Sequence, residues 1–170
     1  MSDCRFAIRR LGSSDLDAFR LIRLEGLEND PEAFGSTFEK ESSESGQYFL
    51  DRLTRSAVFG GFAGDHLVGV AGFYSFEDTK SRHKGVLWGM YVTPGARGSG
   101  LATTLVETLL EHASKEVEQI QLTVVTSNPR ARRFYERMGF VEYGLEEKAL
   151  KYKGAYFDEV LMVKFLRPKE

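Results

Sequence analysis

The chain has 170 residues, of which 42% are apolar and 12% aromatic, enough for one folded domain with a sizeable core. Its 23 basic and 25 acidic residues leave a net charge of −2, which disfavours binding to a nucleic-acid backbone. No apolar run approaches the roughly 20 residues that cross a bilayer, and the N-terminus lacks the layout of a signal peptide. The one cysteine, Cys4, permits neither an internal disulfide nor a cysteine-based zinc site, and we expect it to be a small apolar strand residue. We therefore predict one cytoplasmic domain over residues 1–170, without a metal, a membrane or a nucleic-acid partner.

The first third of the chain predicts a strand followed by helices. Residues 5–11 partly alternate apolar and basic side chains, and a capping cluster at Ser13 to Asp15 marks a helix start. From Leu16, apolar residues recur at helical spacing until the polar run before Pro31 ends the pattern. The acidic, serine-rich stretch 31–45 leaves room for a short helix, and residues 47–55 predict a second one.

Strands dominate the middle and the end of the chain. Residues 57–62 and 66–76 predict a hairpin across a Gly64–Asp65 turn, and residues 86–92 predict a strand that enters a glycine-rich loop. A broad apolar helical face begins at Leu101, and residues 119–126 alternate as a strand. Pro129 opens a further helix that Gly139 ends, and two strands follow over about 140–151 and 156–165.

The glycines of the central loop are unusually dense. Five of them fall within sixteen positions: Gly85, Gly89, Gly95, Gly98 and Gly100. A strand followed by such a loop at the mouth of a helix leaves backbone amides open at the helix N-terminus, which suits a phosphate or pyrophosphate. A nucleotide P-loop does not fit, since Leu101 and Ala102 replace its lysine and hydroxyl residue, and a dinucleotide fingerprint is disfavoured by Thr103. On the loop alone, a purely structural strand-to-helix connection stays equally open.

Two motifs together resemble the GNAT superfamily of acetyl-CoA-dependent N-acetyltransferases. Arg97, Gly100 and Ala102 fill its Arg/Gln-x-x-Gly-x-Gly/Ala pyrophosphate loop, and residues 128–140 fill its Asn-x-x-Ala-x-x-Phe-Tyr-Glu-x-x-Gly-Phe stretch without a gap. The resemblance covers roughly residues 57–165 in element order. It implies an α/β (α+β) fold, a single GNAT-like domain with a mixed central sheet of about six to seven strands flanked by about four helices.

The resemblance also implies a set of cofactor-binding residues. Backbone amides of the loop would hold the pyrophosphate of acetyl-CoA, and the strand before it would offer main-chain groups to the pantetheine arm. Asn128 would bind the pantetheine side and cap the following helix. The residues implied to bind acetyl-CoA are Met90, Tyr91, Val92, Arg97, Gly98, Ser99, Gly100, Leu101, Ala102, Asn128 and Tyr135.

Candidate catalytic residues follow from the same chemistry, in which an amine attacks the thioester directly in a ternary complex. Tyr135 would protonate the departing thiolate as a neutral phenol, although a purely core role beside Phe134 and Met138 is its alternative. Some members of the family carry a glutamate on the strand before the loop, and it is missing here, so we consider Glu25, His83 and Glu159 as the base. We expect burial to raise the pKa of Glu159 on the last strand.

The acceptor is a small-molecule amine or a protein N-terminus or lysine. Acidic and aromatic residues of the first third, among them Glu25, Asp30, Phe34 and Glu41, predict an acidic cleft that favours a cationic amine. A CoA-binding sensor without catalysis is the alternative function, and a nucleotide-binding switch is a more distant one. A homodimer stays open.

Overall fold

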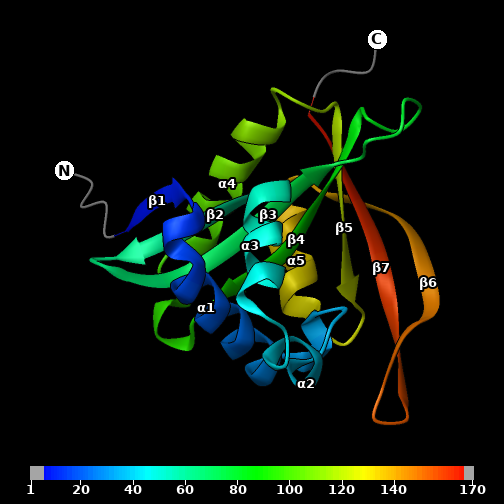
Figure 1. The fold of residues 1–170 in the computed structure, drawn as a ribbon. Coiled ribbons are helices and arrows are strands. Elements are labelled where there is room, and N and C mark those ends of the chain that lie inside the picture. The colour runs from blue at the N-terminus through cyan, green and yellow to red at the C-terminus, as the bar shows by residue number, and fades with distance from the viewer. Residues whose placement is uncertain (1–5, 167–170) are drawn as a thin grey trace.

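The protein is described by a computed structural model that covers residues 6–166 (Figure 1). Cys4 therefore lies outside the described residues. The seven strands of this range are β1 (Ala7–Arg10), β2 (Ala57–Ala63), β3 (His66–Ser75), β4 (Lys84–Val92), β5 (Gln119–Val125), β6 (Val141–Tyr152) and β7 (Ala155–Phe165). Its five α-helices are α1 (Leu16–Asn29), α2 (Phe38–Ser42), α3 (Gly46–Arg55), α4 (Leu101–Ala113) and α5 (Pro129–Arg137).

The strands form one mixed sheet in the order β1-β2-β3-β4-β5-β7-β6. Every neighbouring pair is antiparallel except β4 and β5, which run parallel. A parallel pair needs a crossover, and α4 supplies it between the two strands. The predicted α/β class with a sheet of six to seven strands is confirmed, with five α-helices where about four were expected.

Helices cover both faces of the sheet, and the side chains of β2 point alternately to one face and to the other. Val58 and Phe62 pack with α1 and α3, whereas Ala57 and Phe59 pack with α4. Each face thus has its own apolar core, and burying one large side chain there stabilises the fold by roughly 1.5–3 kcal/mol. No helix of the described range is both long and apolar enough to span a membrane.

The two central strands separate soon after they start. β4 and β5 pair only from Lys84 to Val86, and beyond this point they diverge (Figure 1). Within β4, the three steps from Trp88 to Tyr91 lie opposite only two steps of β3, so β4 carries a bulge there. Gly89 has a φ of +63° within this bulge, a left-handed conformation that favours glycine. The irregularity expected at Gly89 is therefore confirmed.

Most predicted boundaries agree with the structure to within two residues. The last hairpin turns at Lys153–Gly154, between β6 and β7. At α5, the core alternative considered for Tyr135 has support in the structure. Tyr135 is the buried residue of this helix, whereas Phe134 and Met138 beside it are only partly buried.

Candidate active site

A cavity of about 1020 Å³ lies where β4 and β5 separate. Its walls come from β4 over residues 86–92, β5 over residues 121–125 and both helical layers. Residues of α1, the segment before α2, and α3 line it from one side of the sheet, and residues of α4 and α5 line it from the other. The gap between β4 and β5 thus connects the part of the cavity on the α1 side of the sheet with the part on the α4 side.

The glycine loop forms one end of the cavity. Gly98 and Gly100 have φ values of +74° and +87°, and a Cβ atom on either would meet nothing within 4 Å. Within residues 6–166, the backbone N–H groups of Gly98, Ser99, Gly100, Ala102 and Thr103 donate no hydrogen bond. Open amides at the start of a 13-residue helix form a site for an anion, so the loop fits the pyrophosphate of acetyl-CoA.

Side chains around the loop fix its shape. The Arg97 guanidinium donates to the Val92 carbonyl at 3.0 Å and to Asp30 at 2.8 Å, which ties the loop to β4 and to the end of α1. The Ser99 hydroxyl donates to the Ala96 carbonyl at 2.5 Å. Leu101 is buried, so of this residue only the backbone can reach a ligand.

The strand before the loop presents its edge to the cavity. Met90, Tyr91 and Val92 all line it, at positions where β4 no longer pairs with β5. Main-chain groups on this edge have no strand partner, and they can therefore hydrogen-bond to an amide-containing chain such as pantetheine.

Asn128 and α5 line the cavity from the α4 side of the sheet. The side-chain oxygen Oδ1 of Asn128 accepts a hydrogen bond from the backbone amide of Ala131 at 3.0 Å, so the predicted helix cap is present. Asn128 also lines the cavity. Arg130 and Arg137 line it as well and add positive charge on this side.

Tyr135 is both a core residue and a cavity residue. Its ring packs edge-on against Phe134 and Phe140, with centroids 5.2 and 5.7 Å away. Its hydroxyl finds no hydrogen-bond partner in the described part of the chain, and the residue lines the cavity. Burial raises the pKa of the Tyr135 hydroxyl well above its ordinary value of 10.0, so the phenol is neutral at physiological pH.

The three candidate bases occupy different places. Only Glu159 lines the cavity. Burial raises the pKa of Glu159, the negative charge of Glu146 adds to the increase, and Thr123 opposes it through a hydrogen bond. Glu25 accepts a hydrogen bond from the Tyr91 hydroxyl, and His83 lies in the turn before β4; neither lines the cavity.

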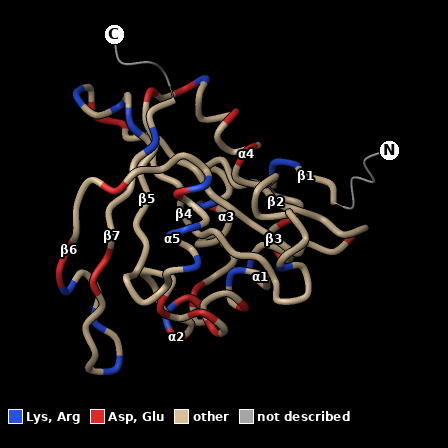
Figure 2. The backbone as a smooth tube through the Cα atoms, turned by 180° about the vertical axis from the view of Figure 1, so that it is seen from behind, with Lys and Arg blue, Asp and Glu red and all other residues tan. Residues whose placement is uncertain are grey.

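The cleft is not acidic, which corrects the expectation from the first third of the chain. Of the acidic residues considered there, only Asp30 lines the cavity, and it is paired with Arg97. Glu41 is completely buried in an ion pair with Arg23. Both basic and acidic residues are spread over the elements of the described chain (Figure 2), so the charge of the site depends on which side chains line the cavity and not on overall composition.

Sequence reasoning missed a basic group on the α1 side of the cavity. Arg23, Lys40 and Arg52 line it there, together with Trp88. Lys40 and Arg52 lie twelve positions apart on different helices, and no motif links them. The sequence held one indirect sign that this side of the cavity differs from that of some family members. Trp88 lies in the strand region where those members carry a glutamate.

No group of three or more His, Cys, Asp or Glu side chains in residues 6–166 is placed to hold a metal ion.

Among solved structures, the fold is similar to a GNAT-family acetyltransferase from Streptococcus pneumoniae, with 23% identity, a TM-score of 0.79 and coverage of 94% of this chain and 98% of that one. It is also similar to a ribosomal-protein-alanine N-acetyltransferase from Brucella melitensis, with 24% identity, a TM-score of 0.78 and coverage of 94% and 99%. A third similar structure is yncA, a putative acetyltransferase from Salmonella typhimurium with its cofactor acetyl-CoA, with 17% identity, a TM-score of 0.84 and coverage of 97% and 96%.

The family model of the acetyltransferase (GNAT) family matches residues 23–140, which include the helices on both faces, the split strands, the glycine loop and Tyr135. This match and the geometry of the cavity agree on the cofactor, acetyl-CoA. The chain belongs to the GNAT family of acetyltransferases.

Proposed function

We propose that this acetyltransferase moves an acetyl group from acetyl-CoA to a primary amine by direct attack in a ternary complex. Acetyl-CoA supplies the acetyl group as a thioester. The observation that carries the proposal is Tyr135, a neutral phenol that lines the cavity without a hydrogen-bond partner in residues 6–166. A phenol in this state can donate its proton to a leaving thiolate.

The glycine loop and the β4 edge position the reaction. The open amides of the loop would hold the pyrophosphate, and the edge at Met90 to Val92 would align the pantetheine arm. These amides belong to Gly98, Ser99, Gly100, Ala102 and Thr103. A main-chain amide on the same edge would also stabilise the oxyanion that develops during the attack. Asn128 would bind from the α5 side of the cavity.

Glu159 is the base that we propose for the incoming amine. It lies on β7, lines the cavity and has a raised pKa, so it accepts a proton more readily than an exposed glutamate does. Glu25 does not line the cavity and already accepts a hydrogen bond from the Tyr91 hydroxyl, so it suits this role less well.

The acceptor is a small molecule or a protein amine. The printed names of similar structures include a ribosomal-protein-alanine N-acetyltransferase and a putative phosphinothricin N-acetyltransferase, at 24% and 15% identity. Such different acceptors on one fold show that the acceptor must be inferred from the site itself.

The test measures thiol release from acetyl-CoA with a panel of amines, with mass spectrometry of the acetylated product. We expect amine-dependent thiol release that falls sharply in Tyr135→Phe, while acetyl-CoA binding, measured by calorimetry, is retained. Tight binding of acetyl-CoA without thiol release from any amine would instead favour a CoA-binding sensor.

A further inference from the structure

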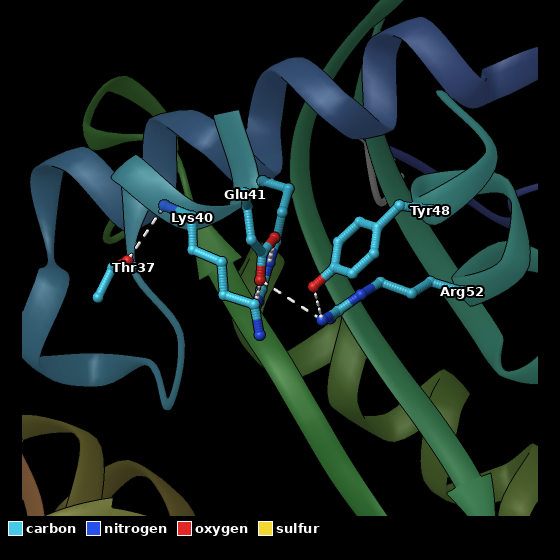
Figure 3. Close-up of polar contacts among 6 residues, drawn as sticks. Thr37, Lys40, Glu41, Tyr48 and Arg52 are labelled. Carbon is cyan, nitrogen blue, oxygen red and sulfur yellow. Dashed lines mark hydrogen bonds and ion pairs between the residues drawn. The ribbon is translucent and has the colours of Figure 1, made fainter. Parts of the chain in front are cut away.

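A buried ion cluster stands on the α1 side of the cavity. Glu41 of α2 is completely buried, and Arg23 of α1 donates two hydrogen bonds to its carboxylate, at 2.9 and 2.8 Å. Arg52 of α3 reaches the same carboxylate at 3.4 Å (Figure 3). Burial alone would raise the pKa of Glu41, but its pairing with Arg23 and Arg52 outweighs this effect and keeps the pKa below its ordinary value. One negative charge thus faces two guanidinium groups.

Arg52 is the more exposed guanidinium of this cluster, and it has unused donors. Its hydrogen bonds to Tyr48 and to Glu41 both come from Nη2, and within residues 6–166 its Nε and Nη1 donate none. Its side chain is 28% exposed and lines the cavity. The planar fork of an arginine matches a carboxylate, so free donors here suit an anionic group.

Aromatic rings hold Arg52 in place before any ligand arrives. Its guanidinium lies 4.6 Å from the ring centroid of Tyr48 and 5.3 Å from that of Trp88. Because these contacts already restrict the side chain, binding an anion costs less conformational entropy than it would with a mobile arginine.

Lys40 adds a second cation beside Arg52. The Thr37 hydroxyl caps α2 by accepting from the Lys40 amide at 3.2 Å, and Figure 3 shows the side chain of Lys40 extending past Glu41. In the described residues no carboxylate lies within 4 Å of its ammonium group, and Lys40 lines the cavity. Together the three cations and Glu41 leave a surplus of positive charge at this end.

This cationic end is separate from the pyrophosphate loop. Arg52 lies against Trp88, four residues before Val92 on β4, which corresponds to about 13 Å of strand. It also belongs to the α1 side of the sheet, whereas α4 begins on the other side. The surplus charge therefore faces the acceptor half of the cavity, where Phe34 and Trp88 supply apolar walls and Glu159 supplies a carboxylate.

We propose that Arg52 and Lys40 bind an anionic group of the acceptor, so that the enzyme acetylates amines that also carry a carboxylate, as amino acids do. This inference rests on the proposed acetyl transfer. The amine end would lie toward Glu159 and the carboxylate end on Arg52 and Lys40. Arg23, whose Nε and Nη2 both donate to Glu41 and whose side chain is only 6% exposed, is a positioning residue that keeps the cluster in place.

The test compares each of a panel of α-amino acids with its carboxamide, which keeps the amine and removes the negative charge. We expect kcat/KM for the preferred amino acid to exceed that for its carboxamide by about tenfold or more, since a hydrogen bond to a charged group contributes strongly. Arg52→Gln and Lys40→Gln should each bring this ratio toward one through the acceptor KM. Lys115→Gln, which removes an exposed charge beyond α4, should leave it unchanged.

Binding provides a readout that does not depend on turnover. Trp88 is the one tryptophan of the chain and lies against Arg52, so its fluorescence reports on this end of the cavity. Saturable quenching of this fluorescence by the amino acid but not by its carboxamide, with the quenching lost in Arg52→Gln, supports the inference. If such quenching is seen but no thiol is released, only the proposed acetyl transfer is overturned. Turnover with equal preference for both compounds, or a preference for polyamines, overturns the inference and leaves acetyl transfer intact. Lys40→Gln keeps the test valid if Arg52→Gln does not fold.

Discussion

The Tyr91 hydroxyl donates a hydrogen bond to Glu25 across 2.9 Å, joining the strand that enters the glycine loop to the helix beneath it. Asn29 donates to the same hydroxyl, also at 2.9 Å. Burial, opposed by the Asn29 hydrogen bond and reinforced by Glu25, raises the pKa of the Tyr91 hydroxyl, which therefore stays protonated and can donate. Glu25 thus links α1 to β4, and we expect it to support this contact and not to act as the base.

Removing this link should affect stability more than chemistry. Tyr91→Phe loses the hydroxyl and should lower the free energy of unfolding by about 1 kcal/mol, measured by urea titration. Glu25→Gln keeps an oxygen that can accept the bond but cannot act as a base, and its kcat should stay close to that of the wild type. A large loss of kcat in Glu25→Gln would return Glu25 to the catalytic machinery.

Tyr135→Phe should lower kcat by about 100-fold or more, the usual contribution of a general acid, with little change in the KM for acetyl-CoA. Burial keeps the pKa of Tyr135 above 10.0, so its titration should not limit the rate at ordinary alkaline pH. Tyr156→Phe, at an exposed tyrosine of the β6–β7 hairpin, is the matched control. Equal rates in both variants would assign Tyr135 to the core alone.

Glu159 should set the acidic limb of the pH profile. As a base it must be ionised, so kcat/KM should fall as the pH drops through a pKa that lies above the ordinary 4.5 of glutamate. Glu159→Gln should lose most of the activity and this limb with it.

A neighbouring charge offers a sharper check on the same assignment. Glu146 contributes to the raised pKa of Glu159, so Glu146→Gln should lower that pKa and move the limb toward lower pH while the plateau rate is kept. A limb that does not move would show that another group titrates.

Gly100→Ala should weaken acetyl-CoA binding. Its φ of +87° costs an L residue about 1–2 kcal/mol, and if the loop relaxes out of this conformation, binding falls by about tenfold. Gly95→Ala is the matched control, because Gly95 lacks a positive φ and a Cβ there also meets nothing within 4 Å. Calorimetry with acetyl-CoA measures both variants, and equal affinities would contradict the role of loop conformation.

Glu41 should make the protein sensitive to acid. Its folded-state pKa lies below the ordinary 4.5, so its stabilisation is complete above that value and is lost as the pH falls through the lower, folded-state pKa. Glu41→Gln leaves Arg23 buried without a carboxylate and should cost about 3–5 kcal/mol at neutral pH. Glu142→Gln, at an exposed pair with Arg132, should change stability by no more than about 1 kcal/mol.

The cofactor half of the site was readable from the sequence because its determinants are local. Gly98 and Gly100 act through their own backbone conformation. Asn128 caps α5 by accepting a hydrogen bond from the amide of Ala131, only three residues further along the chain. Tyr135 is placed by the same helix. Short spacing along the chain is therefore enough to predict where these groups lie.

The acceptor half depended on the tertiary structure. Glu41 looked like part of an acidic surface, yet the packing of α2 against α1 buries it against Arg23, while Arg52 and Lys40 line the cavity. Charge at a site is set by which side chains face the cavity and which are paired behind it, and those pairs join residues far apart in the chain. By itself the sequence determined the α/β fold, the family and the loop that we propose for acetyl-CoA. Only the folded arrangement of three helices decided that the end of the cavity that we propose for the acceptor is cationic.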